Sequence, residues 1–147
     1  MLYTEMTKKA LKICFDAHKN QTDKSGMPYV FHPFHLAEQM DDEESTIVAL
    51  LHDVIEDHGD RYSLDDLRAE GFSDAVLEAL TLLTHKKGVS YEDYIRQIKN
   101  NPLATKVKLA DLAHNSDVSR LDHEPTPKDR ERLEKYAKSR AILQEND

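Results

Sequence analysis

The segment Leu50-Leu51-His52-Asp53-Val54-Ile55-Glu56-Asp57 places four ionisable side chains inside a run that is otherwise apolar from Ile47 onward. If the segment is helical, residues four apart share a face, so His52 lies below Glu56 and Asp53 below Asp57. Burying such groups without partners would cost on the order of several kcal/mol. A bound cation is the simplest compensation. The alternative, a surface helix with solvated acids, is disfavoured by the apolar residues that surround the four groups.

The composition fits one acidic domain over residues 1–147. Twenty basic and 28 acidic residues give a net charge of −8, which argues against binding to nucleic acid or to a membrane surface. An anionic substrate would then need a metal ion and a few well-placed lysines. The single cysteine, Cys14, excludes an internal disulfide and favours the cytoplasm, and its helical surroundings predict a core position. No apolar run approaches the roughly 20 residues of a membrane span, and no signal peptide opens the chain.

The pattern of apolar residues predicts an all-α fold, a compact multi-helix bundle. All four glycines separate segments of helical periodicity, and no hairpin signal occurs. Phe15 and Ala137 are among the apolar residues expected to face the core, although the last helix is the most polar one and is expected to lie outside the bundle. The predicted helices cover 4–18, 33–40, 45–57, 61–70 and 127–143, and others open at 73, 90 and 102, with caps at Ser63, Ser73, Ser90, Asn101 and Thr126.

Four candidate metal ligands, His32, His52, Asp53 and Asp111, come from three separate segments. Imidazole and carboxylate together suit Mn²⁺, Zn²⁺ or Fe²⁺, and four protein ligands leave positions open for water and substrate, as in catalytic sites. Adjacent ligands on one helix point about 100° apart, so an ion must sit between their directions. The alternative for Asp111 is a structural acceptor of N–H groups within its own helix.

Further residues extend this hypothesis. A water bound to such a metal loses its proton near neutral pH, and Glu56 and Asp57 are placed one turn on to orient it or to act as acid or base. His114 is expected to pack behind the ligands. Of Lys106 and Lys108, at most one can reach the site. Lys86 and Lys87 either supply positive charge to a polyphosphate or form a solvated helix end.

The order of these motifs resembles the HD metal-dependent phosphohydrolases. The resemblance is greatest to the hydrolase domain of Rel/SpoT-type alarmone enzymes and to small stand-alone hydrolases related to it. It covers about residues 10–121. The matching residues are Ala17-His18 with Gln21, Lys24-Ser25-Gly26-Met27-Pro28-Tyr29, His32-Pro33, Leu51-His52-Asp53-Val54-Ile55-Glu56-Asp57, Val107-Lys108-Leu109-Ala110-Asp111 and His114-Asn115.

The resemblance implies an HD-domain bundle that removes the 3′-pyrophosphate of guanosine tetra- or pentaphosphate, usually with Mn²⁺. It implies that Glu56 and Asp57 assist the attacking water, and that Lys24, Ser25 and Asn115 contact the nucleotide. The metal would be held by the four ligands already named. Because the chain stops short of the synthetase and regulatory domains of long Rel/SpoT proteins, a relative of this length is expected to hydrolyse only.

Two residues depart from the family pattern. Asp23 stands where the family commonly has an arginine that packs on the guanine, and Asp117 adds a negative charge after Asn115. These changes keep two alternatives open: a phosphohydrolase of another nucleotide or dinucleotide phosphate, and a catalytically idle module that binds metal and nucleotide. The sequence determines neither the native metal nor the oligomeric state.

Overall fold

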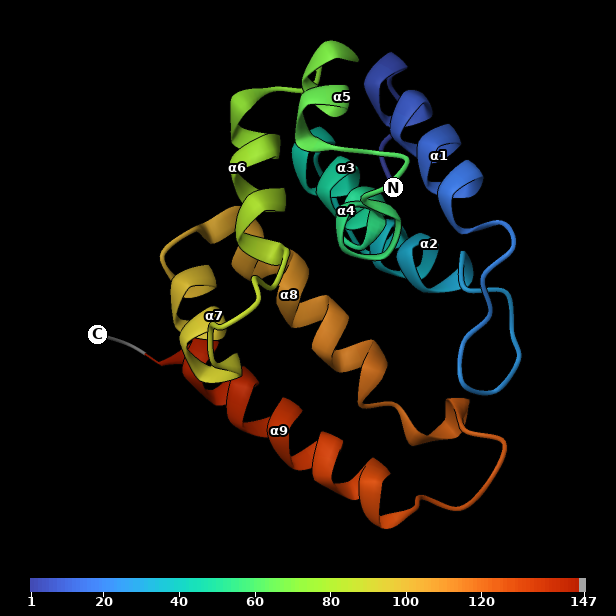
Figure 1. The fold of residues 1–147 in the computed structure, drawn as a ribbon, viewed down its shortest axis with the longest axis vertical. Helices are drawn as coiled ribbons and strands as arrows, with labels where there is room; N and C mark the ends of the chain where they lie inside the picture. Colours follow the sequence, from blue (N-terminus) through green and yellow to red (C-terminus); the bar gives the residue numbers. More distant parts are fainter. Residues whose placement is uncertain (146–147) are drawn as a thin grey trace.

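The computed structural model describes residues 1–145 and builds them almost wholly from helices (Figure 1). No strand occurs among these residues, in which an isolated β-bridge joins Thr22 to Pro28. The prediction of an all-α fold is confirmed. In chain order the elements are α1 (Glu5–His18), α2 (Phe31–Glu38), α3 (Glu43–Leu51), α4 (Val54–His58), α5 (Leu64–Ala69), α6 (Asp74–Leu83), α7 (Tyr91–Lys99), α8 (Pro102–Asn115), the 3-10 helix η1 (Val118–Arg120) and α9 (Pro127–Gln144).

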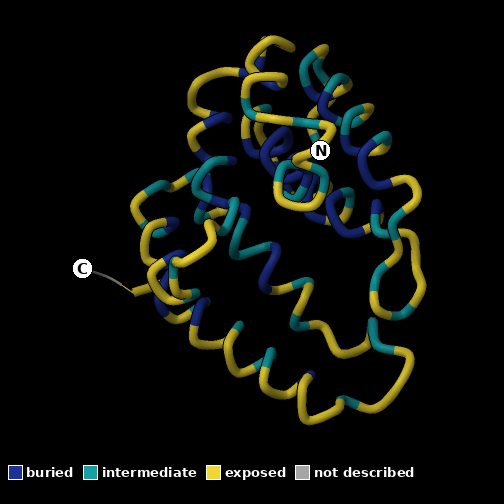
Figure 2. The backbone as a smooth tube through the Cα atoms, in the orientation of Figure 1, coloured by how far each residue is buried: buried dark blue, intermediate teal, exposed yellow. Residues whose placement is uncertain are grey.

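Helix α3 forms the centre of the molecule. Every residue from Ser45 to Leu51 is buried, and α1, α2, α6 and α8 pack around the helix (Figures 1 and 2). A helix that is apolar on all sides requires such an interior position. The hydroxyls of Ser45 and Thr46 donate to the backbone oxygen of Asp42, so these buried polar groups are satisfied. The C-terminal end of α3 therefore delivers His52 into the interior.

Side-chain caps determine where the helices begin. Ser63, Ser73, Ser90 and Asn101 each accept a hydrogen bond from the backbone N–H three residues further on, and Thr126 does the same for α9. Such a cap satisfies one of the free N–H groups of a helix's first turn. These five predicted caps are confirmed.

The predicted continuous helix over 45–57 is wrong. The chain leaves the α-helix at His52 and Asp53 and starts again as α4 at Val54. Asp53 has φ −105° and ψ −2°, values of the bridge region between helix and strand, where active-site residues are often found. The side chains of residues 52 and 53 therefore need not diverge by the roughly 100° that separates adjacent residues on an α-helix.

Two burial predictions on the outer helices are also wrong. Phe15 is 54% exposed, because the narrow face of Ala10, Cys14 and Ala17 turns toward α3 and rotates Phe15 outward. Ala137 is exposed on α9, which packs against α7 and α8 (Figure 1). Cys14 is fully buried as predicted, and burial raises its pKa to about 12, so it remains a thiol.

Helix α9 is the longest helix described and runs along one flank of the molecule, mostly exposed (Figure 2). Its end joins the core through the buried Ile142 and Leu143. None of the helices in residues 1–145 combines the length and the apolar character needed to cross a membrane.

The connection between α1 and α2 is a structured loop. Asp23 Oδ1 accepts the backbone N–H groups of Ser25 and Met27, both at 2.9 Å, and Gly26 has a φ of 81°, which a glycine adopts without strain. Ser25 Oγ donates to the backbone oxygen of Arg120 at 3.2 Å. The loop is therefore held against η1, and the two segments lie side by side at one end of α8 (Figure 1).

Candidate metal centre and adjoining cavities

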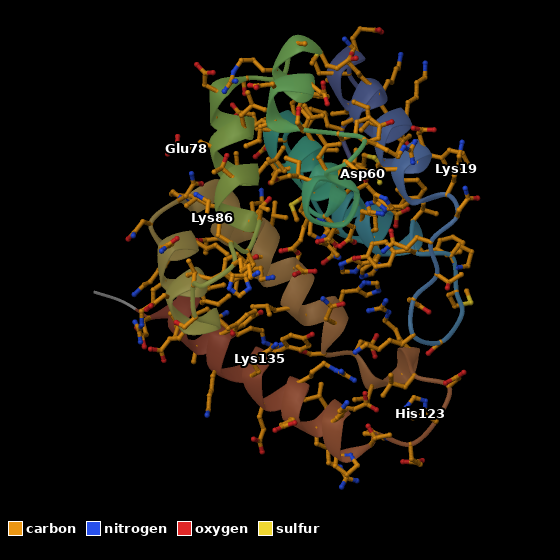
Figure 3. The ribbon with its side chains drawn as sticks, viewed as in Figure 1. Lys19, Asp60, Glu78, Lys86, His123 and Lys135 are labelled. Carbon is orange, nitrogen blue, oxygen red and sulfur yellow. The ribbon has the colours of Figure 1, made fainter. Side chains whose placement is uncertain are left out.

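The four predicted metal ligands meet at one point. His32 is in the first turn of α2, His52 and Asp53 form the break between α3 and α4, and Asp111 is on α8. Asp111 Oδ1 lies 2.8 Å from His32 Nε2 and 3.4 Å from His52 Nε2. Asp53 Oδ2 lies 3.0 Å from His52 Nε2 and 3.9 Å from His32 Nε2. Figure 3 shows side chains crowding the space between α4, α2 and α8.

The break after α3 produces this convergence. On an unbroken helix the side chains of residues 52 and 53 would diverge by about 100°. Here the turn brings an oxygen of Asp53 within 3.0 Å of a nitrogen of His52. The sequence analysis named the residues that meet here, but it expected a geometry in which an ion had to sit between two diverging directions.

The protonation of His52 favours a cation at this point. His52 Nδ1 lies 2.7 Å from the backbone oxygen of Ala49, which only accepts, so Nδ1 carries a proton and Nε2 is the ring nitrogen that faces the two carboxylates. His52 Nε2 is buried and makes no hydrogen bond. Burial opposes a charge on His52, but Asp53 and Asp111 outweigh it and raise its pKa well above the ordinary range. The two carboxylates thus favour positive charge, a proton or a metal ion, at His52 Nε2.

The separations suit one shared ion. Ligand atoms bound about 2.1 Å from a first-row divalent ion lie about 3.0 Å apart at right angles and about 3.4 Å apart at tetrahedral angles. His32, His52 and Asp53 offer one atom each within 4.8 Å of one another. Asp111 is not part of that group, but its Oδ1 lies 2.8 Å from His32 Nε2, just inside the right-angle separation, and 3.4 Å from His52 Nε2, at the tetrahedral separation. The donor set can therefore hold a divalent metal ion.

Asp111 also has structural partners, which the sequence left as an alternative. Lys108 Nζ lies 2.8 Å from Asp111 Oδ2, and Asn115 Nδ2 donates to Oδ1 at 3.1 Å. Burial opposes the charge of Asp111, but Lys108 and the nearby imidazoles of His32 and His52 hold its pKa well below the ordinary value. Lys106 points elsewhere and pairs with Asp41, so one of the two lysines reaches the site, as predicted. Asp111 is thus fixed as a carboxylate.

A second layer of side chains orients the candidate ligands. His32 Nδ1 lies 2.7 Å from His114 Nδ1, and burial, followed by Arg120, lowers the pKa of His114 to about 4. A neutral His114 accepts a hydrogen bond from the N–H at His32 Nδ1, so His32 Nε2 is the ring nitrogen that faces Asp111. Tyr29 donates its hydroxyl proton to Asp53. Such outer partners fix the tautomer and direction of metal ligands.

Glu56 and Asp57 lie beside the ligand cluster on α4, and both are exposed. Glu56 Oε1 accepts the backbone N–H of His85 at 2.9 Å. Partial burial, followed by the charges of Asp53 and Asp57, raises the pKa of Glu56 above its ordinary value. A carboxylate with a raised pKa beside a metal centre is the arrangement expected of a proton acceptor.

Gln21 connects this helix to the end of α1, a role that sequence reasoning missed. Its Oε1 lies 2.7 Å from both His18 Nδ1 and His58 Nε2, and its Nε2 donates to Asp57 Oδ2 at 3.2 Å. An oxygen that serves two imidazoles requires both rings to donate. The available signal was the place of Gln21 in the motif that begins at His18.

Removing the hydrogen bonds of Gln21 is expected to lower the stability of the fold. We expect Gln21→Ala to lower the free energy of unfolding by about 2 kcal/mol, because it leaves the donor of the fully buried His18 without its acceptor. Urea unfolding measures the change. The exposed Gln97→Ala on α7 is the control and should change stability by no more than about 0.5 kcal/mol. Equal effects of the two substitutions would contradict this role.

Two adjoining cavities open beside the cluster, and both are lined by Asp23, Tyr29, His32 and Arg120. The smaller, the polar cavity, has about 290 Å³. The larger, the aromatic cavity, has about 550 Å³ and a mostly apolar lining that includes residues such as Phe31 and His114. The three predicted nucleotide contacts lie together in the polar cavity, with two residues that sequence reasoning missed: Lys24, Ser25, Asn115, Arg120 and Tyr136.

Positive charge gathers around the polar cavity. Burial, and then the nearby cation Arg132, lowers the pKa of Lys24, and Lys135 contributes in the same direction. Figure 3 shows Lys135 on the side of α9 that faces the bundle. Lys86 instead lies in the connection between α6 and α7, where it lines a separate cavity of about 40 Å³ (Figure 3). The cations near the polar cavity come from α8, η1, α9 and the loop between α1 and α2. The net charge of −8 for the whole protein gives no sign of this local cluster.

The chain shares sequence with Rel/SpoT-type proteins. It is 34% identical over 121 residues to the bifunctional (p)ppGpp synthase/hydrolase SpoT of Escherichia coli, covering 74% of this chain and 17% of that protein. It is 34% identical over 144 residues to the GTP pyrophosphokinase of Streptomyces coelicolor, covering 88% of this chain and 17% of that protein. The chain thus spans about a sixth of the length of these relatives. No protein-family model matches it.

The fold has a solved counterpart. A metazoan orthologue of SpoT that hydrolyses ppGpp superimposes with a TM-score of 0.74 over 98% of this chain and 88% of that one, at 24% identity. This similarity shows that the helical architecture is shared. Together with the sequence matches, it gives the chain its place: it belongs to the Rel/SpoT family of alarmone enzymes, as a counterpart of their HD-type hydrolase domain.

Proposed function

We propose that the chain is a single-domain, metal-dependent pyrophosphohydrolase that removes the 3′-pyrophosphate of guanosine tetra- or pentaphosphate. The observation that carries this proposal is the convergence of His32, His52, Asp53 and Asp111 beside a polar cavity with cations around it. A further relative, the guanosine-3′,5′-bis(diphosphate) 3′-pyrophosphohydrolase of Escherichia coli O157:H7, is 34% identical over 121 residues, which cover 74% of this chain and 17% of that protein. A core that extends from α1 to α9 supports one domain.

These four side chains are the proposed ligands of a divalent ion, with Mn²⁺ as the native metal. When bound, such an ion lowers the pKa of water and neutralises phosphate charge. The protein's own contribution is the fixed arrangement of its donors. His52 is locked by Ala49, His32 by His114 and Asp53 by Tyr29, so the ligand atoms face one point before any substrate arrives.

Glu56 and Asp57 are the proposed partners of the attacking water. Glu56, with its raised pKa, accepts the proton that the water loses, and Asp57, held by Gln21, orients the water. Both lie within about one helical turn of Asp53 on α4, and both residues are exposed. A pair of this kind serves turnover and has no use in a module that only binds.

The polar cavity is the proposed seat of the substrate's phosphates. Lys24 and Ser25 approach it from the loop and Asn115 from α8, where Asn115 also donates to Asp111. These positive and polar groups offset the overall negative charge of the protein. Asp23 is the observation that keeps a second substrate class open, namely another nucleotide or a dinucleotide phosphate, because it brings a carboxylate to the same cavity.

The experiment that tests this function is release of pyrophosphate and phosphate from purified protein with Mn²⁺. The panel contains guanosine tetraphosphate, guanosine and adenosine triphosphates, and dinucleotide phosphates. We expect pyrophosphate from guanosine tetraphosphate at a rate well above that of every other compound. Turnover of a different compound would move the protein to the second substrate class. Binding without any turnover would identify an idle module.

Removal of the metal is expected to loosen the fold. Without a cation, the two carboxylates of the cluster repel each other, or the cluster must take up protons. At metal concentrations about 100 times the dissociation constant, binding should add about 2.7 kcal/mol, or roughly 5–11 °C in the midpoint of thermal unfolding. Melts with Mn²⁺ and with a chelator measure this difference. An unchanged midpoint would count against a metal at this site.

A further inference from the structure

Arg120 occupies the junction of the polar and aromatic cavities and lines both. It ends the 3-10 helix η1, five residues after Asn115. Its backbone oxygen accepts Ser25 Oγ, and its own Nη1 donates to the backbone oxygen of His114 at 2.8 Å. The guanidinium is therefore anchored on one side by backbone, close to the ligand His32 that also lines both cavities. No role for Arg120 follows from the motifs of the sequence.

Asp23 lies next to Arg120, and it too lines both cavities. Its Oδ1 is occupied by the backbone N–H groups of Ser25 and Met27, while its Oδ2 lies 3.8 Å from Arg120 Nη2. That separation is an ion pair without a hydrogen bond. A guanidinium has five N–H donors. The remaining donors of Arg120 can therefore serve a ligand, and the nearby carboxylate weakens the attraction of that ligand when it is an anion.

A protein of net charge −8 needs fixed cations where it binds a polyphosphate. Arg120 is the guanidinium among the residues that line these two cavities, and it is only partly exposed. A guanidinium binds phosphate oxygens in a forked geometry and loses little freedom when it is already anchored. The backbone contacts of Arg120 supply that anchoring.

We propose that Arg120 is a nucleotide-binding residue that receives a phosphate group of the substrate at the junction of the two cavities, and that Asp23 sets the strength of this contact. The inference rests on the proposed function for the identity of the substrate. It gives Asp23 a role in this chain: Asp23 shapes the loop through Oδ1 and tunes Arg120 through Oδ2.

The test is a double-mutant cycle on the full chain, read by calorimetric titration of guanosine 5′-diphosphate in the presence of chelator. Arg120→Met should weaken binding roughly ten- to a hundredfold, which corresponds to the loss of a charged hydrogen bond. Asp23→Asn keeps the acceptor for the two loop N–H groups and removes the charge, so it should tighten binding several-fold. Arg68→Met, on α5 and away from both cavities, is the charge-matched control and should bind like the wild type.

The coupling between the two sites decides the proposal. If Arg120 is the group that Asp23 tunes, Asp23→Asn should bring less gain when Arg120 is already Met. An equal gain in both backgrounds would show that Asp23 acts on the ligand directly and would overturn the pairing. Unchanged binding by Arg120→Met, with an unchanged melting midpoint, would overturn the role of Arg120.

The outcome also separates this inference from the proposed function. A wild type that binds the diphosphate but releases no pyrophosphate from guanosine tetraphosphate would reject the proposed activity, while the cycle would still decide the role of Arg120. A wild type that binds no diphosphate would overturn the role of Arg120, while pyrophosphate release with Mn²⁺ would still decide the proposed activity. Turnover of guanosine tetraphosphate with an unchanged KM in Arg120→Met would leave the activity standing and reject Arg120.

Discussion

Asp53→Ala is expected to abolish both metal binding and turnover. Asp53 contributes the oxygen that lies 3.0 Å from His52 Nε2. Its side chain turns toward the cluster at the break between α3 and α4. Loss of an outer partner of a metal ligand costs roughly 10–100-fold in metal affinity, so loss of a ligand should cost more. Calorimetric titration with Mn²⁺ measures the affinity, and pyrophosphate release measures the turnover.

The matched control is Asp60→Ala, two residues beyond the end of α4 and exposed (Figure 3). It removes the same charge from the protein without touching the cluster, so metal affinity and rate should stay at wild-type values. Asp53→Ala protein that still binds Mn²⁺ with wild-type affinity would show that the ion sits elsewhere.

Glu56→Gln is expected to abolish turnover and to spare the metal. The amide keeps an oxygen for the backbone N–H of His85, so the local structure is preserved, but it cannot accept a proton. Loss of a general base typically costs roughly 10²–10⁴-fold in rate. The rate constant kcat and the Mn²⁺ affinity, measured on the same preparation, check this prediction. A full rate in Glu56→Gln would refute the proposed role of Glu56, and Glu78→Gln on α6 controls for the lost charge (Figure 3).

The pH dependence gives Glu56 a second signature. Burial raises its pKa above the ordinary value of 4.5, and a base works only when it is ionised. The rate should therefore fall as the pH drops through that raised pKa, at a higher pH than an ordinary glutamate would give. The same shift means that the folded state binds this proton more tightly than the unfolded one, so ionised Glu56 lowers stability above that pH. Glu56→Gln should accordingly lose rate without losing stability at neutral pH.

The fold class and the candidate metal ligands could be predicted for local reasons. Helix caps such as Ser63 and Asn101 act within three residues, so the sequence displays them directly. His52 and Asp53 stand out because charged groups in an apolar run need compensation. The structure brings both together with His32 and Asp111, as the sequence analysis expected of a shared site.

The sequence could not reveal features that depend on contacts between distant segments. The break between α3 and α4 places His52 and Asp53 against His32 and Asp111 from other helices, whereas the local pattern favours a continuous helix. Gln21 and Arg120 acquire their roles from partners 36 and 95 residues away, which no periodicity reports. The prediction that Phe15 faces the core was wrong because the small side chains of α1 allow a close approach to α3, and the large Phe15 is left on the outer face.

The central claim is that the break after α3 turns two adjacent residues, together with His32 and Asp111, into one metal site. Anomalous scattering from a crystal grown with Mn²⁺ tests it most directly. The account predicts one ion about 2.2 Å from His32 Nε2, His52 Nε2, Asp53 Oδ2 and Asp111 Oδ1. An ion held by other residues, or an empty cluster with Asp111 engaged by Lys108 alone at saturating Mn²⁺, would contradict it.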